Sequence, residues 1–299
     1  MEFKLLLQKY FETRLELIET SLKHYVGTAA APAQNLKKAM RYAVFSGGKR
    51  WRPLLLISIY EMLTGFRKKK GINDAVLAGV AIELVHNASI VHDDLPMVMN
   101  SPLRRSNPAV HQKFDNTIAI LTGDALHTLA YEVLGGLSRP EQALEAVRLL
   151  ASHTKSYGMI GGQMVDLESK RKVMKINTLR FIDMKKVGSL LQAAADIACV
   201  LAEAEENTRQ IMNTYALNLG LAYQMIEDIV EDYNRGSAGL DFDQEYVPTS
   251  RNSYTGILGY DRARSTVEKM LEESERLIKP FPNNDVLMEF IQMIQERLP

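Results

Sequence analysis

The sequence predicts an all-α protein, on three observations. Apolar residues recur at the spacing of helix faces along nearly the whole chain. No sustained alternation of apolar and polar residues between hairpin turns is present. The chain has 299 residues, of which 46% are apolar and 24% charged, a composition typical of a globular protein with a large core. We expect a single domain over residues 1–299, built from more than about ten helices.

Helical segments follow one another with polar breaks between them. The first begins near the N-terminus, where Leu6, Tyr10 and Leu17 roughly share one face. Further helices are predicted at 53–65, 74–92, 117–137, 141–157, 178–203, 207–232, 260–279 and 284–298. Glycine, proline and polar residues interrupt them at 46–53, 66–72, 102–108 and 138–142. The polar stretch 234–256 exceeds the usual loop length, so we expect a lid or a partly disordered segment there.

Charge and targeting signals argue against several classes of protein. The 36 basic and 36 acidic residues cancel, so we expect no nucleic-acid partner. The N-terminus carries charges throughout and lacks the pattern of a secretory signal. No stretch approaches about 18 uncharged apolar residues, so no membrane span is expected. The single Cys199 rules out an internal disulfide, and we expect a cytoplasmic protein.

Two acidic segments lie far apart in the chain. Asp93 and Asp94 follow the apolar run AIELVHNASIV. The helical segment YQMIEDIVED carries four acids in pairs at i,i+4 spacing, so each pair faces one way. Acids crowded on an apolar helix repel one another and need a counter-charge. Oxygen-only ligands favour Mg²⁺, and two such clusters facing one another would form a magnesium site.

Two basic segments complement these acids. Lys49, Arg50 and Arg52 stand in GGKRWRP beside two glycines that allow close approach of the backbone. Arg104 and Arg105 follow shortly after the first acidic pair. Guanidinium groups match phosphate oxygens in two-point contacts, and a lysine adds a point charge. Acids that hold magnesium and cations that hold phosphate together predict a diphosphate ligand.

Six motifs in this order and spacing resemble the trans-isoprenyl diphosphate synthases, the farnesyl and geranylgeranyl diphosphate synthase family. They are GGKRWRP, HNASIVHDDLP followed by LRR, GDAL, GMIGGQMVDL, KKVGSLL and YQMIEDIVED, and the resemblance spans about residues 40 to 275. It implies the helical isoprenoid synthase fold with a central cavity, and usually a homodimer. It also implies condensation of isopentenyl diphosphate with an allylic prenyl diphosphate, helped by Mg²⁺.

The resemblance implies roles by position. The diphosphate of isopentenyl diphosphate would be held by Lys49, Arg52, His86 and Arg105. The allylic diphosphate would be held by Arg104, Lys186 and Gln224. Magnesium would be bound by Asp93, Asp94 and Asp228, with Glu227 and Glu231 at acidic positions of the second motif. The residues expected to act in catalysis are Asp93, Asp94, Arg104, Lys186 and Asp228.

The first acidic motif departs from the family pattern. The family places a third aspartate where Met99 stands, and a further acidic pair at the positions of Ser101 and Pro102. This part of the chain is therefore less negative than the family pattern. Each missing ligand would cost on the order of 10²–10³ in rate if it acts in the transition state.

Other motifs also depart from the pattern. Asp-Asp-x-x-Asp has become Glu227-Asp228-Ile-Val-Glu231, and Val187 stands where threonine is expected. Of two lysines expected in the later lid, Leu240 occupies one position and Arg251 replaces the other as a substrate contact. We expect ionisation of the allylic substrate to be weakened.

These departures leave alternatives to an active prenyltransferase. A relative that has lost catalysis would serve as a regulatory or partner subunit. A terpene synthase-like protein would ionise a prenyl diphosphate without condensing it, but would not need the isopentenyl diphosphate residues. An unrelated di-iron protein is suggested by Glu83-x-x-His86 and Asp124-x-x-His127. That chemistry leaves the basic segments unexplained.

Product length is expected to depend on residues just before the first acidic pair. Bulky side chains four and five residues upstream block chain growth in this family. Ser89 and Ala88 stand there, and both are small. We therefore expect a product of geranylgeranyl length or longer.

Overall fold

The computed structural model describes residues 2–27, 32–65, 71–170, 172–236 and 252–299. Its internal contacts divide the chain into two compact units. Unit 1 comprises residues 1–149 and 200–202, and unit 2 comprises residues 150–199 and 203–299. This division concerns contacts and not independent folding, so the single domain stays a prediction.

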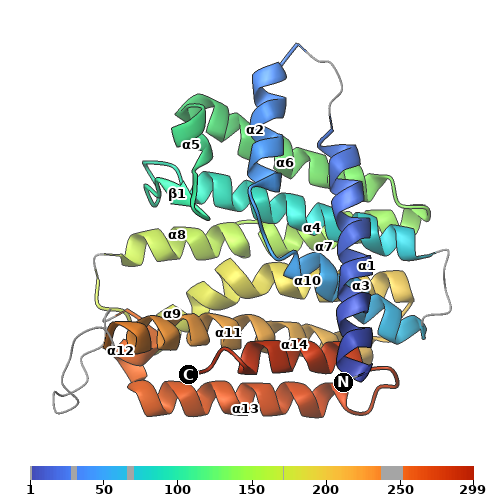
Figure 1. Ribbon diagram of the computed structural model, residues 1–299, viewed down its shortest axis with the longest axis vertical. Helices are drawn as coiled ribbons and strands as arrows, with labels where there is room; N and C mark the ends of the chain where they lie inside the picture. The colour runs from blue at the N-terminus through green and yellow to red at the C-terminus, as the bar shows by residue number, and fades with distance from the viewer. Residues whose placement is uncertain (1, 28–31, 66–70, 171, 237–251) are drawn as a thin grey trace. The chain divides into compact units, whose positions relative to one another are not determined.

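Unit 1 is built around one apolar helix, α4 (Ile72–Asp93), which packs against α1 (Glu2–Tyr25), α2 (Gln34–Phe45), α3 (Trp51–Thr64) and α6 (Asn116–Gly135) (Figure 1). Fourteen of its residues are buried, which explains why its sequence is apolar on nearly every face. By length and composition alone α4 qualifies as a possible membrane span, but 72% of that window is buried within the protein. A central core helix has these same properties.

Local signals in the sequence set the ends of the unit 1 helices. The Asp115 side chain caps α6 by accepting the Ile118 N–H at 2.7 Å. Helix α3 ends at Gly65, whose left-handed backbone closes the last turn. A two-residue hairpin pairs β1 (Leu103–Arg104) with β2 (Asn107–Pro108), in the register Leu103 to Pro108 and Arg104 to Asn107. The short helix α5 (Val110–Lys113) follows.

Unit 2 is built on the long helix α11 (Glu206–Gly236). It packs against α9 (Ile176–Asp183), α12 (Tyr254–Leu258), α13 (Tyr260–Ile278) and α14 (Asp285–Gln295) (Figure 1). Helix α8 (Met159–Ser169) packs against a π-helix, η2 (Met184–Gly188), which lies between α9 and α10 (Ser189–Ala202). The boundary between the two units falls within α10 and within α7 (Pro140–Thr154).

A buried polar cluster joins the helices of unit 2. Asp196 on α10 accepts hydrogen bonds from Arg209 at 3.0 Å and Asn213 at 3.0 Å, and lies 2.8 Å from the His153 ring nitrogen. Burial would raise the pKa of Asp196, but the contacts of His153 and Arg209 outweigh it and lower that pKa. The carboxylate thus stays ionised and holds α7, α10 and α11 together.

The prediction of an all-α fold is confirmed, and the expected helices are present with shifted ends. The sequence pattern did not reveal α2, α8 and the short α5 and α12. The predicted helix 178–203 was wrong in one respect, because η2 interrupts it. Most of the predicted lid, including Leu240 and Arg251, lies outside the described residues.

Candidate active site

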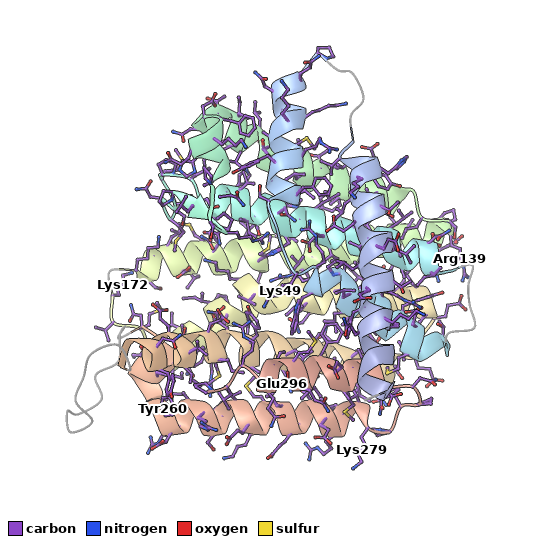
Figure 2. All side chains as sticks on the ribbon, viewed as in Figure 1. Lys49, Arg139, Lys172, Tyr260, Lys279 and Glu296 are labelled. Carbon is purple, nitrogen blue, oxygen red and sulfur yellow. The ribbon has the colours of Figure 1, made fainter. Side chains whose placement is uncertain are left out.

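The basic segment of unit 1 forms a tight turn between α2 and α3. Gly47 and Gly48 have φ angles of 99° and 143°, and Arg50 is left-handed with a φ of 52°. A side chain at Gly48 would place its Cβ 2.9 Å from guanidinium nitrogens of Arg50 and Arg105. The backbone angle thus favours glycine at both positions, and the close contacts add a second reason at Gly48. The turn exposes the Lys49 side chain (Figure 2).

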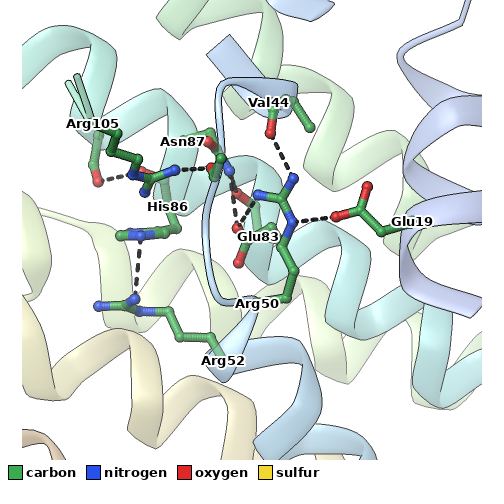
Figure 3. A network of polar contacts seen from close by, with 10 residues as sticks. Glu19, Val44, Arg50, Arg52, Glu83, His86, Asn87 and Arg105 are labelled. Carbon is green, nitrogen blue, oxygen red and sulfur yellow. Dashed lines mark hydrogen bonds and ion pairs between the residues drawn. The ribbon is translucent and has the colours of Figure 1, made fainter. Parts of the chain in front are cut away.

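A buried ion pair holds this turn in place (Figure 3). The Arg50 guanidinium donates to Glu83 at 2.9 Å, to Glu19 at 2.8 Å and to the Val44 carbonyl at 2.7 Å. Arg50 and Glu83 are 3% and 2% exposed, so neither would be stable there without the other. Burial opposes the charge on Arg50, but Glu83 and Glu19 outweigh it and raise its pKa. A left-handed arginine is unfavourable, and these contacts compensate for it.

The ion pair also places His86 opposite Arg52. Glu83, His86 and Asn87 lie three and four residues apart on α4 and share a face. The Asn87 amide donates to the Glu83 side chain at 3.2 Å, which fixes that carboxylate. Arg52 lies in the first turn of α3, with a guanidinium nitrogen 3.3 Å from Nε2 of His86 (Figure 3). The predicted contact residues Arg52 and His86 are therefore neighbours.

The hairpin delivers Arg105 to the same place. Arg105 and Ser106 form its two-residue turn, with φ angles of 92° and 64°, as type I′ turns require. Neither residue is a glycine, so the turn is strained. The Arg105 guanidinium donates to the Gly47 carbonyl, and Figure 3 shows it near the His86 ring on the side opposite Arg52. The segments 46–53 and 102–108 thus meet on unit 1.

Positive charge gathers around His86. Burial, followed by the charges of Arg52, Arg105, Arg50 and Arg104, lowers the His86 pKa well below its ordinary value. The imidazole is therefore neutral near pH 7, and it stands among several guanidinium groups. An anion placed among them would gain charge-assisted hydrogen bonds. A diphosphate has the charge and the several oxygens that this arrangement suits.

The first acidic pair is already partly engaged. Asp94 is 2% exposed, and both of its carboxylate oxygens accept from Arg104, with Nε at 3.1 Å from Oδ2. This hydrogen bond raises the pKa of Arg104. The predicted roles of Asp94 as a magnesium ligand and Arg104 as a phosphate contact stay predictions, and each requires this pair to open.

The loop after Asp93 is held by its backbone. The Met99 N–H donates to the Asp93 carbonyl at 3.0 Å, and Ser101 donates to the Asp94 carbonyl at 3.1 Å. The Met99 side chain is 41% exposed, so it does not fill the core. Val98 packs on a core cluster that includes Val91 and Leu95. Asp93 itself is half-buried. Met99 therefore occupies the expected ligand position without a packing role that would require a methionine.

Lys186 of unit 2 lies on the π-helix η2, an element frequent at functional sites. Its ammonium group is 2.9 Å from Oδ2 of Asp166 on α8. A Cβ at Gly162 would lie 2.5 Å from the backbone nitrogen of Lys186, so only glycine lets α8 come this close. The motif GMIGGQMVDL thus positions Lys186 through both a glycine and an acid.

The acids of α11 have different surroundings. Glu227 is ion-paired with Arg297, whose other nitrogen donates to the Tyr223 hydroxyl at 2.9 Å. Glu231 is exposed, and Gln224 lies one turn before Asp228. Asp228 accepts the Tyr254 backbone N–H at 2.8 Å on Oδ2. Within the described part of the chain, no further hydrogen bond or ion pair reaches Asp228.

Among the described residues, the charges that act most strongly on Asp228 are negative. Burial, followed by the charges of Asp232, Glu231 and Glu227, raises its pKa to about 6, although the Tyr254 N–H opposes this. Asp183 on α9 extends the acidic region, since Asp228 and Asp166 contribute to raising its pKa to about 7, after burial as the main cause. The nearby Tyr254 side chain acts in the opposite direction and lowers the pKa of Asp183. The Tyr254 hydroxyl and Oδ2 of Asp183 nevertheless make no hydrogen bond of normal geometry with any described residue.

The acids of α11 suit a magnesium ion that takes few of its ligands from the protein. No group of three or more histidine, cysteine or acidic side chains is arranged to hold a metal among the residues described. Mg²⁺ typically takes one or two carboxylates and completes its shell with water and phosphate. Asp228 offers such a carboxylate, with one oxygen fixed by Tyr254 and excess negative charge around it. The cluster therefore suits a divalent cation that arrives with a phosphate ligand.

The structure brings several of the predicted residues together within unit 1. In unit 1, Arg52, His86 and Arg105 gather at one turn, and Asp94 pairs with Arg104. The meeting of the unit 1 acids with those of α11 stays a prediction. Sequence reasoning missed Asp183 and Tyr254, which stood outside the motifs. The di-iron alternative loses Glu83, because Arg50 and Asn87 occupy that carboxylate.

His86 offers a direct test of the cationic site. We predict that the pKa of His86 in the free protein lies below its ordinary value, and that inorganic pyrophosphate raises it, because added negative charge favours the imidazolium. The measurement is an NMR titration of ¹³C-labelled histidine, with His153 of unit 2 as the internal control. Arg105→Gln should raise the pKa of His86 in the free protein, because it removes one positive charge near the ring. A His86 pKa unmoved by pyrophosphate would contradict this site.

Comparison with known proteins agrees with this chemistry. The family model for polyprenyl synthetase matches residues 33–239. Geranylgeranyl pyrophosphate synthase 3 of Arabidopsis thaliana is 34% identical over 259 residues, covering 82% of this chain and 69% of the relative. Farnesyl diphosphate synthase of Micrococcus luteus is 32% identical over 274 residues, covering 89% and 91%.

Solved structures agree in fold. The FPP/GFPP synthase of Zymomonas mobilis superposes with a TM-score of 0.84 at 28% identity, covering 97% of this chain and 99% of the other. The geranyltransferase of Helicobacter pylori gives a TM-score of 0.84 at 26% identity, covering 96% and 97%. The chain therefore belongs to the polyprenyl synthetase family.

Proposed function

We propose that this chain is a trans-prenyltransferase that condenses isopentenyl diphosphate with an allylic prenyl diphosphate. The observation that carries the proposal is the gathering of Arg52, His86 and Arg105 at the turn held by Arg50. The family and its relatives named farnesyl and geranylgeranyl diphosphate synthases support it. Mg²⁺ is the proposed cofactor, and its proposed ligands are Asp93, Asp94, Glu227, Asp228 and Glu231.

The proposed reaction follows from the two charge patterns. Lys49, Arg52 and Arg105 hold the diphosphate of isopentenyl diphosphate, and neutral His86 donates one hydrogen bond to it. Lys186 and Arg104 bind the allylic diphosphate. Bound magnesium would reduce the negative charge on the departing group.

The bond changes involve one carbon of the allylic substrate, three carbons of isopentenyl diphosphate and one proton. The allylic C–O bond breaks, and its electron pair leaves with pyrophosphate. The double bond of isopentenyl diphosphate supplies the pair that forms the new C–C bond. A proton is then lost to pyrophosphate, which restores a double bond. The protein contributes electrostatic stabilisation of the leaving group and orientation of the two substrates.

Two alternatives concern how active the chain is. Met99 offers no carboxylate, and Asp94 is bound by Arg104, so the first motif has fewer ligands than the family pattern. A regulatory or partner subunit would tolerate these losses. A terpene synthase-like activity is less well supported, because the intact Arg52, His86 and Arg105 group would have no substrate.

We also propose that the protein acts as a homodimer in the cytoplasm. Ile120 and Leu121 on α6 are 40% and 49% exposed, and such apolar surface suits an interface with a second copy. The single Cys199 is buried, and it suits a reducing compartment.

Turnover of defined substrates tests the activity. With Mg²⁺ and labelled isopentenyl diphosphate, the protein should extend dimethylallyl, geranyl or farnesyl diphosphate, and a chelator should stop the reaction. Asp228→Asn should lower the rate on the order of 10²–10³, because it weakens stabilisation of the leaving group. Asp261→Asn in the first turn of α13 is the matched control and should change little. Binding of the diphosphates without any turnover would instead support the regulatory subunit.

Met99→Asp tests whether a magnesium ligand is missing. The variant restores a carboxylate at an exposed position, so the fold should tolerate it. We expect a higher turnover rate and a lower Mg²⁺ requirement, on the order of tenfold. Met97→Asp, two residues earlier and also exposed, is the control and should have no such effect. Equal rates for Met99→Asp and the unchanged protein would count against a missing ligand.

Product length tests the role of Ala88 and Ser89. Ala88 is 2% exposed on α4, whereas Ser89 is half-buried and donates to the His86 carbonyl at 2.8 Å. Ala88→Phe and Ser89→Phe should each shorten the product, because a ring would fill the space for the growing chain. Chromatography of the dephosphorylated products measures this. An unchanged product distribution in both folded variants would place the limit elsewhere.

A further inference from the structure

A short segment of unit 2, Asn252–Thr255, is fastened at three points, once to the segment 172–174 and twice to α11. We call it the clasp. The Asn252 side chain accepts the Met174 N–H at 2.9 Å and donates to the Lys172 carbonyl at 2.9 Å. The Thr255 hydroxyl donates to Oδ2 of Asp232 on α11. Its third attachment is the Tyr254 N–H, which donates to Asp228.

The clasp is buried and has a defined backbone. Ser253, Tyr254 and Thr255 are 9%, 1% and 0% exposed. Ser253 caps α12 by accepting the Gly256 N–H at 3.0 Å. Tyr254 is the first residue of α12, where a backbone N–H has no partner within the helix. The Asp228 carboxylate accepts a hydrogen bond from this N–H and so satisfies it. Negative charge is also favoured at the start of a helix.

These contacts give Asp228 and Asp232, which share one face of α11, different surroundings. Asp228 and Asp232 are four residues apart and point the same way. The Tyr254 N–H takes Oδ2 of Asp228, which fixes the rotation of that carboxylate and leaves Oδ1 for another ligand. Asp232 is 5% exposed and is engaged by Thr255. Asp228 is half-buried and therefore more accessible than Asp232, so its Oδ1 is the oxygen placed to reach a cation.

We propose that the clasp is a positioning element of the metal site, resting on the proposed function. It holds Asp228 so that one oxygen is presented to the divalent cation. Asp232 anchors the clasp through Thr255 and does not bind the metal. Metal affinity therefore depends on the Thr255 hydroxyl, although this hydroxyl does not touch the ion. Residues that orient metal ligands commonly affect metal affinity in this way.

The Thr255 hydroxyl provides the first test. Thr255→Val keeps the shape and removes the donor, and it should weaken Mn²⁺ binding in the presence of inorganic pyrophosphate about 10- to 100-fold. Thr255→Ser restores the hydroxyl and should recover wild-type affinity. Thr266→Val on α13, which loses only a bond to the Arg262 carbonyl, is the matched control. Electron paramagnetic resonance of free Mn²⁺ measures the affinity. A separate thermal unfolding curve first shows that each variant is folded.

Two further variants keep the proposal testable if Thr255→Val does not fold. Asn252→Ala releases the other end of the clasp from a half-buried position and should also weaken Mn²⁺ binding. Asp232→Asn keeps an oxygen that accepts from Thr255, so it should bind Mn²⁺ nearly normally. Wild-type Mn²⁺ affinity in both Thr255→Val and Asn252→Ala would overturn the proposal. So would a loss in Asp232→Asn as large as that in Asp228→Asn, because Asp232 would then be a ligand.

Failure of the proposed function gives a different result. In that case the unchanged protein would show no Mn²⁺ binding that depends on pyrophosphate, or Asp228→Asn would bind Mn²⁺ normally. Either result removes the metal site itself, whereas failure of the clasp leaves the site present and insensitive to Thr255.

Discussion

The pairing of Arg50 with Glu83 is the constraint on which the cationic site depends. Both side chains are almost fully buried, and each would be an uncompensated charge without the other. The pair fastens a strained turn to the central helix α4. His86, one helical turn after Glu83, then faces Arg52, and the Gly47 carbonyl receives Arg105. A structural ion pair thus sets the geometry of residues that bind the ligand.

The same division between structural and binding charges recurs in unit 2. Asp196 has enough donors around it to remain ionised while it joins three helices. Burial raises the pKa values of Asp228 and Asp183, and the donors around them are too few to offset it. Acids that lack matching cations within the described residues are the places where an external cation would be stabilised. Asp196 therefore stabilises the fold, whereas Asp228 and Asp183 are the acids available to bind a cation.

The sequence predicted the helices and the chemistry of the motifs, because helix faces and local clusters are periodic or contiguous. It did not predict contacts set by tertiary structure. The left-handed Arg50 and the pair of Asp94 with Arg104 depend on side chains that meet only after folding. The π-helix and the clasp were missed for a related reason: nothing in their local composition distinguishes them from ordinary helix and loop. Met99 was recognised as a departure, and its exposed side chain confirms that packing does not require it.

The groups proposed to bind a ligand are Asp228 in unit 2 and the cluster of Arg52, His86 and Arg105 in unit 1. The most direct measurement is a crystal structure grown with Mn²⁺ and inorganic pyrophosphate, in which anomalous scattering locates the metal. Manganese is expected at coordinating distance from Oδ1 of Asp228, with pyrophosphate bound to the same ion. Manganese and pyrophosphate bound away from Asp228 would contradict this assignment.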